Sequence, residues 1–337
     1  MPTPLLEVQE LRTWFSTSSG IAKAVDGVSF NLNAGETLAI VGESGSGKSI
    51  TALSLMQLVP EPAGYIESGR ILYGGKDLLD LTWEQMRSLR GKDLAMIFQE
   101  PMTSLNPVMT VGWQIREAME VHGKYRGDEA RQRTLSLLDK VGIRDPKQIV
   151  KQYPYELSGG MRQRVMIAMA LSNDPKILLA DEPTTALDVT VQAQILDLLA
   201  NLQKQLGMTM LLITHDLGIV SRVAHRVAVM YGGQIVEQAE TKQLLSNPQH
   251  PYTQGLIASL PTRARRGEDL YTMEGVVPAP TAWPVGCRFA ARCPRKWELC
   301  ERVMPDVYTA EDGRPVRCHL YSPTELDKTK SPAEVAS

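Results

Sequence analysis

A loop of eight residues, Gly42 to Ser49, constrains this chain more than any other part of the sequence. It reads Gly-Glu-Ser-Gly-Ser-Gly-Lys-Ser, which satisfies the Walker A pattern of Gly, four free positions, Gly-Lys and Ser or Thr. The glycines allow successive backbone N–H groups to turn inward around a phosphate. The run 36–41 predicts a strand before the loop, and residues 50–56 predict a helix after it, so that a bound phosphate would lie at a helix N-terminus. The sequence therefore predicts a nucleotide site within an α/β fold.

The residue types of this loop predict separate tasks for its members. We expect Lys48 to contact the β- and γ-phosphates and the Ser49 hydroxyl to bind Mg²⁺. An aromatic pair further upstream, Trp14 and Phe15, could stack on an adenine ring, or could equally belong to the core side of an edge strand. The expected nucleotide contacts of the loop are Gly42, Ser44, Gly45, Gly47, Lys48 and Ser49.

A pair of acidic residues ends a second strand-like run. The apolar residues 176–180 are followed directly by Asp181 and Glu182. In the Walker B arrangement the first acid binds Mg²⁺, and the second could polarise a water for attack on the phosphate. Without a cation, neighbouring carboxylates disfavour each other's ionisation. We therefore expect Asp181 to bind the metal and Glu182 to act as the base.

Two other polar residues are predicted at strand ends beside the phosphates. The run 94–98 is followed by Gln99, whose amide could reach the metal or the attacking water. The run 208–214 is followed by His215, which we expect to reach the γ-phosphate. Gln99 and His215 are therefore added to Glu182 and Lys48 as the expected catalytic residues.

A second helix end able to bind an anion is predicted at Ser158. Ser158 is a favourable helix cap, and Gly159 and Gly160 leave the first N–H groups of the following apolar helix uncovered. We expect these three residues to bind nucleotide phosphate as well. A Ser-Gly-Gly loop before a buried helix would be the alternative without a ligand.

Composition limits the function classes. The chain has 337 residues, of which 43% are hydrophobic, enough for roughly two domains with a substantial core. A formal net charge of −2 argues against nucleic acid as a partner. No apolar run approaches the roughly 18 residues of a membrane-spanning helix, and the first residues lack the pattern of a signal peptide. We expect a cytoplasmic protein that meets a membrane only through partners.

All the cysteines lie near the C-terminal end. They are Cys287, Cys293, Cys300 and Cys318, separated by 5, 6 and 17 residues. Such clustering in a reducing compartment favours a metal over disulfides. Four thiolates could hold a [4Fe–4S] cluster. Zinc fits the wide spacing less well, and unligated thiols are the third alternative.

With these residues in place, the sequence resembles the ATP-binding subunits of ABC transporters over residues 5–248. The resemblance implies an α/β P-loop NTPase of the ABC type, with a RecA-like core, an antiparallel β subdomain and a helical signature subdomain. By spacing, it favours Phe15 as the residue that stacks on adenine, with Trp14 second. It identifies Leu157 to Met161 as the signature, in which Met161 replaces the commoner Gln, and residues 186–188 as the D-loop.

The last quarter of the chain narrows the resemblance to the importers of oligopeptides, dipeptides and nickel, nearest to the D-type ATPases of dipeptide permeases. The segment that carries it begins His-Pro-Tyr-Thr at His250 and continues into the cysteine-bearing end. Family members hold an iron–sulfur cluster at similar cysteines, so the resemblance favours a [4Fe–4S] cluster here. The expected division is a nucleotide-binding domain at 1–250 with its helical subdomain at about 102–172, a C-terminal extension at 251–322 and a polar tail at 323–337.

The resemblance also implies a machine with several subunits. The expected partners are a second, related ATPase that forms a heterodimer with this chain, two transmembrane permeases and a periplasmic substrate-binding protein. The expected location is the cytoplasmic face of the bacterial inner membrane, and the expected cargo is dipeptides, with oligopeptides or nickel as alternatives. A soluble ABC ATPase that acts on ribosomes or DNA fits less well, because the chain has one set of motifs and no sustained heptads.

Overall fold

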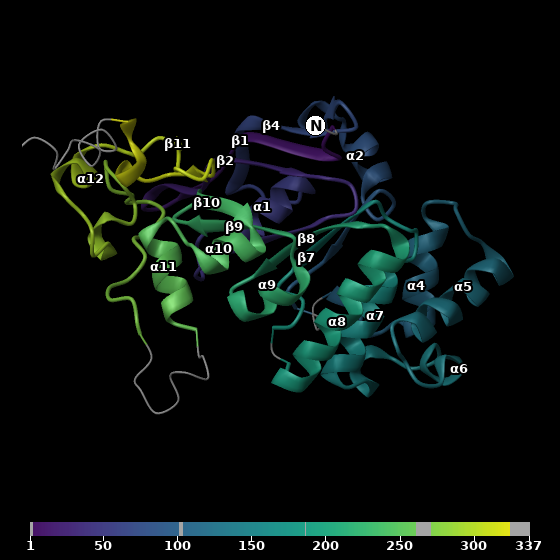
Figure 1. Ribbon diagram of the computed structural model, residues 1–337. Coiled ribbons are helices and arrows are strands. Elements are labelled where there is room, and N and C mark those ends of the chain that lie inside the picture. Colours follow the sequence, from purple (N-terminus) through teal and green to yellow (C-terminus); the bar gives the residue numbers. More distant parts are fainter. Residues whose placement is uncertain (1–2, 101–103, 186, 261–270, 324–337) are drawn as a thin grey trace, which may run out of the picture.

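The computed structural model describes residues 3–100, 104–185, 187–260 and 271–323. Its centre is an eight-stranded mixed sheet with the order β11-β12-β10-β9-β3-β8-β7-β6 (Figure 1). The parallel part of this sheet consists of β9 (Arg226–Tyr231), β3 (Thr37–Val41), β8 (Thr209–Thr214), β7 (Ile177–Asp181) and β6 (Leu94–Ile97). Every residue of β3, β7 and β8 is buried, which explains their nearly continuous apolar sequences.

A smaller antiparallel sheet packs against the P-loop helix. It has the order β2-β1-β4-β5 and consists of β1 (Leu6–Thr17), β2 (Gly20–Leu32), β4 (Gly64–Tyr73) and β5 (Lys76–Asp77). Helix α1 (Lys48–Leu55) contacts β1 and β2 of this sheet and also β7 of the main sheet. Because α1 begins at the last two residues of the P-loop, both sheets hold the phosphate-binding loop in place.

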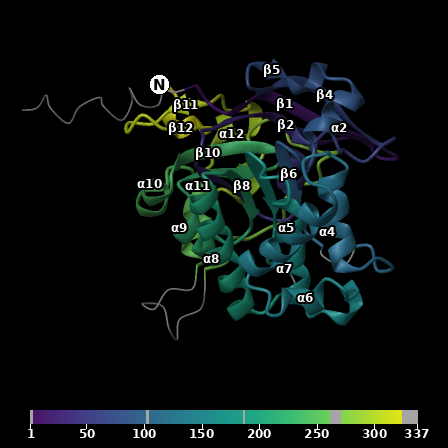
Figure 2. The ribbon, with the colours of Figure 1, turned by 90° about the vertical axis from the view of Figure 1, so that its right-hand side faces the viewer.

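A group of helices covers the end of the main sheet formed by β6, β7 and β8 (Figure 2). Its members are α4 (Val111–Glu120), α5 (Gly127–Lys140), the short α6 (Pro146–Ile149), α7 (Gly159–Ala170) and α8 (Val189–Leu206). Ile115, Leu138 and Ile167 in these helices are fully buried in one apolar cluster with strand residues. Helix α2 (Trp83–Leu89) lies outside this cluster and contributes Met86 to the cluster around α1.

The C-terminal part of the chain returns to the main sheet. After α9 (Leu217–Val223) come β10 (Gln234–Glu240), α10 (Thr241–Ser246) and α11 (Pro251–Ala258). The C-terminal segment, defined here as residues 271–323, contains α12 (Glu298–Arg302), β11 (Tyr308–Thr309) and β12 (Pro315–Val316). β12 pairs with β10 and extends the sheet, so this segment is continuous with the core. Short 3₁₀ turns lie at Leu78–Asp80, Pro154–Glu156, Ala290–Arg292 and His319–Tyr321.

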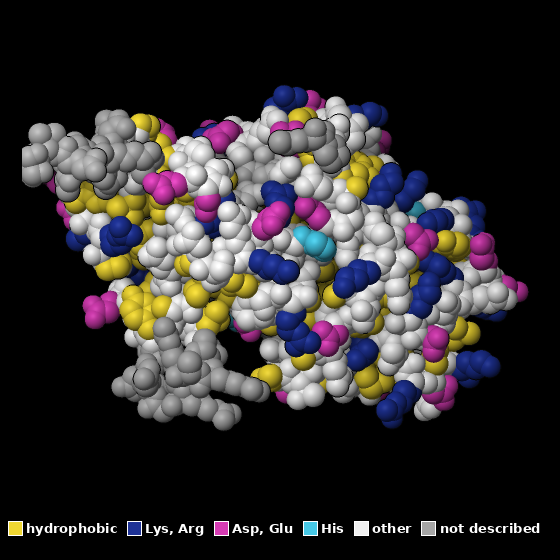
Figure 3. Space-filling view, in the orientation of Figure 1, with side chains coloured by type: hydrophobic (Ala, Val, Ile, Leu, Met, Phe, Trp, Pro, Cys, Tyr) yellow, Lys and Arg dark blue, Asp and Glu magenta, His cyan; other side chains and the backbone are white. Residues whose placement is uncertain are grey.

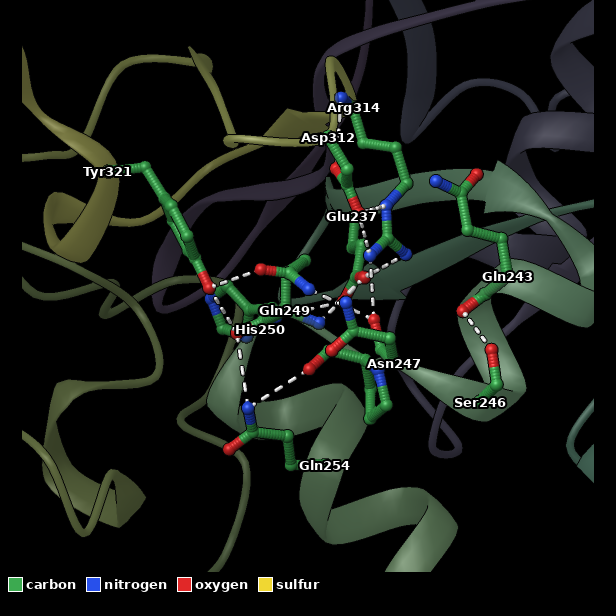
Figure 4. Close-up of polar contacts among 11 residues, drawn as sticks. Glu237, Gln243, Ser246, Asn247, Gln249, His250, Gln254, Asp312, Arg314 and Tyr321 are labelled. Carbon is green, nitrogen blue, oxygen red and sulfur yellow. Dashed lines mark hydrogen bonds and ion pairs between the residues drawn. The ribbon is translucent and has the colours of Figure 1, made fainter.

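A buried carboxylate anchors the C-terminal segment to β10 (Figure 4). Glu237 is 0% exposed, and it accepts hydrogen bonds from the backbone N–H groups of Gln249 and His250, both at 2.9 Å. The Arg314 guanidinium of the C-terminal segment donates to the same carboxylate at 3.3 Å. Tyr321 donates to the Gln249 side chain at 2.9 Å. The carboxylate therefore has partners on both sides of the junction.

Most predicted elements occur close to their expected positions. The strands predicted at 36–41, 94–98 and 208–214 are β3, β6 and β8, whose bounds differ from the expected ones by one residue. The helix predicted at 50–56 begins two residues earlier, at Lys48, because Gly47 is the N-cap of α1. Among the described helices, none combines the length and the apolar character needed to cross a bilayer.

Candidate functional site

The P-loop lies at the carboxyl end of β3, where its shape depends on glycine. Gly45 and Gly47 have φ values of 78° and 102°, in the left-handed region that side chains other than glycine rarely adopt. A Cβ on Gly42 would lie 2.1 Å from the Met230 carbonyl oxygen of β9, so this position has no room for a side chain. Gly47 is also the N-cap of α1, which directs the free N–H groups of the helix into the loop.

Lys48 lies inside this loop with its ammonium group directed at the backbone. Its Nζ donates to the carbonyl oxygens of Gly42 and Glu43, both at 2.9 Å, and the residue is 4% exposed. Burial lowers the pKa of Lys48, an effect that the nearby carboxylates of Glu182, Asp181 and Glu43 oppose. The loop thus holds a cation whose alternative partner would be a phosphate oxygen.

Ser49 and Asp181 meet across the site. The Ser49 hydroxyl donates to Asp181 Oδ1 at 2.9 Å, which joins the start of α1 to the end of β7. Burial raises the pKa of Asp181 to about 6, and the neighbouring charge of Glu182 adds to this rise, while the Ser49 hydrogen bond and Lys48 oppose it. A raised pKa means that the protein compensates the negative charge incompletely. A hydroxyl beside such a carboxylate is a donor set that fits Mg²⁺.

Glu182 follows β7 directly and is surrounded by polar groups from three segments. Gln99 donates to its Oε2 at 3.1 Å, and Thr185 donates to the same oxygen at 3.0 Å. His215 Nδ1 is 3.5 Å from Oε1. Glu182 has a φ of 44°, which is unfavourable for a residue other than glycine and often marks a functional position. The structure therefore brings together the side chains of Gln99, Glu182 and His215, which the sequence places far apart.

His215 differs from the other members of this group in its exposure. Its side chain is 66% exposed, whereas that of Glu182 is 13% exposed. It follows β8, and the next residue, Asp216, caps α9 by accepting hydrogen bonds from two backbone N–H groups. His215 is thus placed at the surface of the site.

The two candidate aromatics of β1 point to opposite faces of the small sheet. The Thr13 hydroxyl lies 2.7 Å from the Ser54 hydroxyl of α1, so odd-numbered residues of this part of β1 face the P-loop helix. Phe15 is on this face, and its ring lies over Gly64, where a Cβ would be 2.6 Å away. Trp14 faces the other way, with Lys23 Nζ 4.9 Å from its ring centroid. The geometry favours Phe15 over Trp14 for contact with a nucleotide base.

The predicted second anion site lies at the start of α7. Ser158 is the N-cap of this helix, and its hydroxyl accepts a hydrogen bond from the Met161 N–H at 3.3 Å. A Cβ on Gly160 would lie 2.9 Å from Val191 of α8, and one on Gly159 would lie 3.4 Å from Leu187. Ser158 to Gly160 are therefore packed beside the start of α8. Within the predicted D-loop, Ala186 lies outside the described residues.

The prediction of an iron–sulfur cluster is wrong. Among the described residues, which include all four cysteines, no group of three or more His, Cys, Asp or Glu side chains is placed to hold a metal ion. Cys287 and Cys293 pack against the apolar cluster around Phe289, whereas Cys318 packs with Ala310 and Val316 in another cluster. The cysteines that were predicted as ligands of a cluster are Cys287, Cys293, Cys300 and Cys318.

The surroundings of three of these thiols are largely apolar, and this shows in the pKa values of the thiols. Burial raises the pKa of Cys287 to about 11 and that of Cys318 to about 12, and it also raises the pKa of Cys293. In the protein without metal, these environments favour the neutral thiols. The four residues are free cysteines, and a buried free cysteine behaves as a small apolar side chain.

Sequence reasoning missed several residues near the P-loop. Thr185, three positions after Glu182, was not predicted to contact that carboxylate. Tyr252 accepts a hydrogen bond from the Glu43 N–H at 2.9 Å, and Arg292 forms an ion pair with the Glu43 side chain at 2.9 Å. The short spacing to Glu182 could have indicated Thr185, but no local pattern indicates contacts across more than 200 residues.

Charged side chains of both signs are mixed on one face of the molecule. Figure 3 shows Lys and Arg side chains interspersed with Asp and Glu on the face in view, with no continuous patch of one sign. A nucleic-acid-binding surface would carry a clustered basic stripe. The charge distribution on this face is thus typical of an ordinary protein surface.

Comparison with known families assigns both parts of the chain. Residues 25–185 match a family described as "ABC transporter". Residues 236–300 match a family described as "Oligopeptide/dipeptide transporter, C-terminal region". The first match contains the P-loop, Gln99, Ser158 and Glu182, and the second contains His250.

Individual relatives match over nearly the full length. The oligopeptide transport ATP-binding protein AppD of Bacillus subtilis (strain 168) is 52% identical, over 94% of this chain and 97% of that protein. The dipeptide transport ATP-binding protein DppD of the same organism is 51% identical, over 94% of each chain. A solved dimeric structure of the ATP-binding cassette MJ0796, bound to ADP and Pi, is 28% identical with a TM-score of 0.62, and covers 70% of this chain and 98% of that chain.

Proposed function

Because the chain belongs to the ATP-binding subunits of the ABC transporters that import oligopeptides and dipeptides, we propose that it powers the uptake of dipeptides. It would do so in a head-to-tail pair with a second, related ATPase. Its activity as an ATP-hydrolysing transport enzyme follows from the family. One observation carries the assignment of that activity to residues. The Ser49 hydroxyl donates a hydrogen bond to Asp181 at 2.9 Å. The next residue, Glu182, accepts hydrogen bonds from Gln99 and Thr185.

Ser49 and Asp181 are the residues that would hold Mg²⁺ in this proposal. When bound, the metal would neutralise charge on the phosphoryl oxygens. Gln99 is a further candidate for the metal's surroundings, because it lies next to Glu182, the neighbour of Asp181. In the protein without metal, the raised pKa of Asp181 records the cost of a buried, poorly compensated carboxylate.

Glu182 is the proposed base. Its Oε2 is engaged by Gln99 and Thr185, so we assign proton acceptance from the attacking water to Oε1. His215 Nδ1, 3.5 Å from Oε1, is positioned to orient that carboxylate and to contact the γ-phosphate. Lys48 would exchange its two carbonyl partners for phosphate oxygens and stabilise the charge that develops there.

The nucleotide would be sandwiched between two chains. Ser158, Gly159 and Gly160 lie beside α8, where their free N–H groups would bind the γ-phosphate of a nucleotide on the partner's P-loop. Phe15 would stack on the adenine ring, and Gly42, Ser44, Gly45 and Gly47 would surround the phosphates. Support comes from the dimeric cassette MJ0796, to which the fold is similar. We propose that the partner ATPase here is a different chain.

The proposed assembly places this chain at the cytoplasmic face of the inner membrane. Two permease subunits would bind it there, and a periplasmic binding protein would deliver the cargo to them. The division into a nucleotide-binding domain at 1–250, an extension at 251–322 and a tail at 323–337 remains part of this proposal. Dipeptides are favoured as cargo by the similarity to DppD, while the similarity to AppD makes longer peptides the alternative.

Capture of the closed state tests the assembly. The Glu182→Gln chain is expressed in its host, the membranes are solubilised with ATP and Mg²⁺, and the chain is isolated with its companions for mass spectrometry. We expect two permeases and a second ATPase. Recovery of this chain alone, or with ribosomal proteins, would contradict the proposed assembly.

Cargo is tested separately. A strain that lacks this chain is supplied with labelled dipeptides, pentapeptides or Ni²⁺, and uptake is compared with that of the complemented strain. Selective loss of dipeptide uptake is expected. Selective loss of pentapeptide or Ni²⁺ uptake would refute the dipeptide assignment and leave the ATPase assignment intact.

A further inference from the structure

A basic residue of the C-terminal segment reaches into the phosphate-binding loop. Arg292 Nη1 donates to both carboxylate oxygens of Glu43, at 3.2 and 2.9 Å. Glu43 is the second residue of the P-loop, 249 positions earlier in the chain. The Arg292 side chain is 5% exposed, so the pair is shielded from water on the arginine side. This ion pair is a direct link between the C-terminal segment and the nucleotide site.

The Arg292 guanidinium is itself held in one position. Its Nε donates to the Glu274 carbonyl oxygen at 3.1 Å, and the guanidinium carbon Cζ lies 5.8 Å from the centroid of the Tyr231 ring. Tyr231 packs edge-on against Tyr252, with 4.6 Å between the ring centroids. An arginine fixed by an aromatic face and a carbonyl loses little entropy when it binds a carboxylate, so the contact with Glu43 is well ordered.

Glu43 is held at each of its polar groups. Arg292 binds its carboxylate, and its N–H donates to the Tyr252 hydroxyl at 2.9 Å. Its carbonyl oxygen accepts from Lys48 Nζ at 2.9 Å and from the Ser46 N–H at 3.2 Å. Glu43 therefore connects Arg292 and Tyr252 with Lys48, and a shift of Glu43 would move the group that meets the phosphates.

A second arginine of the same segment supports the other side of the loop. Arg288 forms an ion pair with Asp26 and donates to the Gly232 carbonyl oxygen. The N–H of the next residue, Gly233, donates to the Ser46 carbonyl oxygen of the P-loop at 2.9 Å. The C-terminal segment thus contacts the surroundings of the P-loop through two basic side chains that lie four positions apart.

Electrostatics explains why Glu43 needs such a partner. A carboxylate in a loop that binds phosphates would repel the nucleotide if it were left uncompensated. Lys48 is shared between two carbonyl oxygens of the loop, whereas Arg292 binds the Glu43 carboxylate directly. Arg292 therefore removes a repulsion and fixes the loop at the same time.

We propose that Arg292 is a positioning residue for ATP: through Glu43 it holds the start of the P-loop in the shape that presents Lys48 to the phosphates. This inference rests on the role proposed above for Lys48. It makes nucleotide affinity depend on the docking of the C-terminal segment, because Arg292 belongs to that segment.

Substitution of Arg292 in the full-length chain tests the proposal by the dissociation constant for ATP with Mg²⁺, measured by calorimetry. Arg292→Met should weaken binding about tenfold, which corresponds to the loss of one charge-assisted hydrogen bond. The dissociation constant of Arg292→Lys should lie between those of Arg292→Met and the parent. In the transport complex, Arg292→Met should raise KM for ATP more than it lowers kcat. An unchanged dissociation constant would overturn the proposal.

Arg314→Met is the matched control, because it also removes a buried arginine of the C-terminal segment from its carboxylate, at Glu237 (Figure 4). We expect it to lower the melting temperature without weakening ATP binding. Equal weakening by both variants would mean that Arg292 acts only through general stability. If Lys48→Ala binds ATP with the parental affinity, both the proposed function and this inference fail. If Lys48→Ala loses ATP binding while Arg292→Met binds ATP with the parental affinity, only this inference is refuted.

Glu43→Ala distinguishes positioning from simple charge attraction. If Arg292 positions the loop, Glu43→Ala should weaken ATP binding. The variant that carries both Glu43→Ala and Arg292→Met should then bind ATP no more weakly than the single variant with the lower affinity. Tighter binding by Glu43→Ala would refute positioning. If Arg292→Met does not fold, Tyr252→Phe removes only the hydroxyl that Glu43 N–H uses and should weaken binding in the same direction.

Discussion

The negative charges of two buried carboxylates in this molecule are compensated to different degrees. Glu237, at the junction with the C-terminal segment, is 0% exposed and receives two backbone N–H groups and the Arg314 guanidinium. Asp181, at the nucleotide site, is 4% exposed and receives the Ser49 hydroxyl, while Lys48 directs its hydrogen bonds to backbone carbonyls. The first charge is neutralised within the chain, whereas the second is compensated only in part, and we propose that Mg²⁺ completes its compensation.

The difference separates a structural acid from a functional one. A buried carboxylate is tolerated when its hydrogen bonds and charge are satisfied, as at Glu237. At Asp181, burial raises the pKa to about 6, which is a cost in stability that the binding of a divalent cation would offset. The same residue class at the end or edge of a sheet thus serves opposite purposes, and only its partners distinguish them.

The largest effect is expected at the nucleotide site. Glu182→Gln keeps the shape and the hydrogen bond from Thr185 but removes the proposed base. Turnover of ATP by the transport complex should fall by about 10²- to 10⁴-fold, the usual range for general base catalysis, while ATP binding is retained. Steady-state phosphate release and calorimetry measure the two quantities. Turnover at the parental rate would exclude Glu182 as the base.

Removal of the Arg314 guanidinium, which pairs with Glu237, should lower the free energy of unfolding. Arg314→Met leaves the Glu237 carboxylate buried beside an apolar side chain, and breaking a buried pair in this way costs about 3–5 kcal/mol. Urea unfolding at pH 7.5 measures the change. Glu237→Gln in the same chain should recover part of the loss, because it removes the unpaired charge. If Arg314→Met proves neutral, Glu237 is not held in the way described.

The nucleotide end was predictable because its signals are local. The P-loop, the acidic pair after β7 and the Ser-Gly-Gly cap each occupy a few consecutive residues, and the geometry that they need follows from backbone chemistry. Buried parallel strands are also recognisable from continuous apolar runs such as that of β7. The family was likewise predictable, because these motifs occur in the expected order.

The C-terminal segment was not predictable in the same way. β12 has two residues, and its place beside β10 depends on tertiary pairing that no periodicity reveals. The ion pair between Arg292 and Glu43 joins residues 249 positions apart. The cysteine spacing led to a wrong metal prediction, because spacing does not show that Cys293 and Cys318 pack in different apolar clusters.

Replacement of Asp181 by a neutral residue should stabilise the protein that lacks nucleotide. Because the pKa of Asp181 is raised from 3.8 in the unfolded chain to about 6 in the folded chain, the ionised form destabilises folding by about 3 kcal/mol above pH 6. Asp181→Asn should gain that amount at pH 8, and the gain should vanish as the pH falls from 6 to 3.8. Urea unfolding at several pH values without Mg²⁺ checks this. A gain that is independent of pH would contradict the assignment.

The junction should respond to acid in the opposite direction. Burial lowers the pKa of His250 to about 3, from 6.5 in the unfolded chain, so the unfolded state binds the proton first. Stability should therefore be complete above pH 6.5 and fall on acidification towards pH 3, by about 2 kcal/mol between pH 7 and pH 5. His250→Asn keeps a side chain able to cap α11 and removes the titration, so it should flatten this slope. If the slope persists in the variant, the acid sensitivity belongs to another group. The slope should also persist in Asp181→Asn, because the two sites exchange protons independently and with opposite signs.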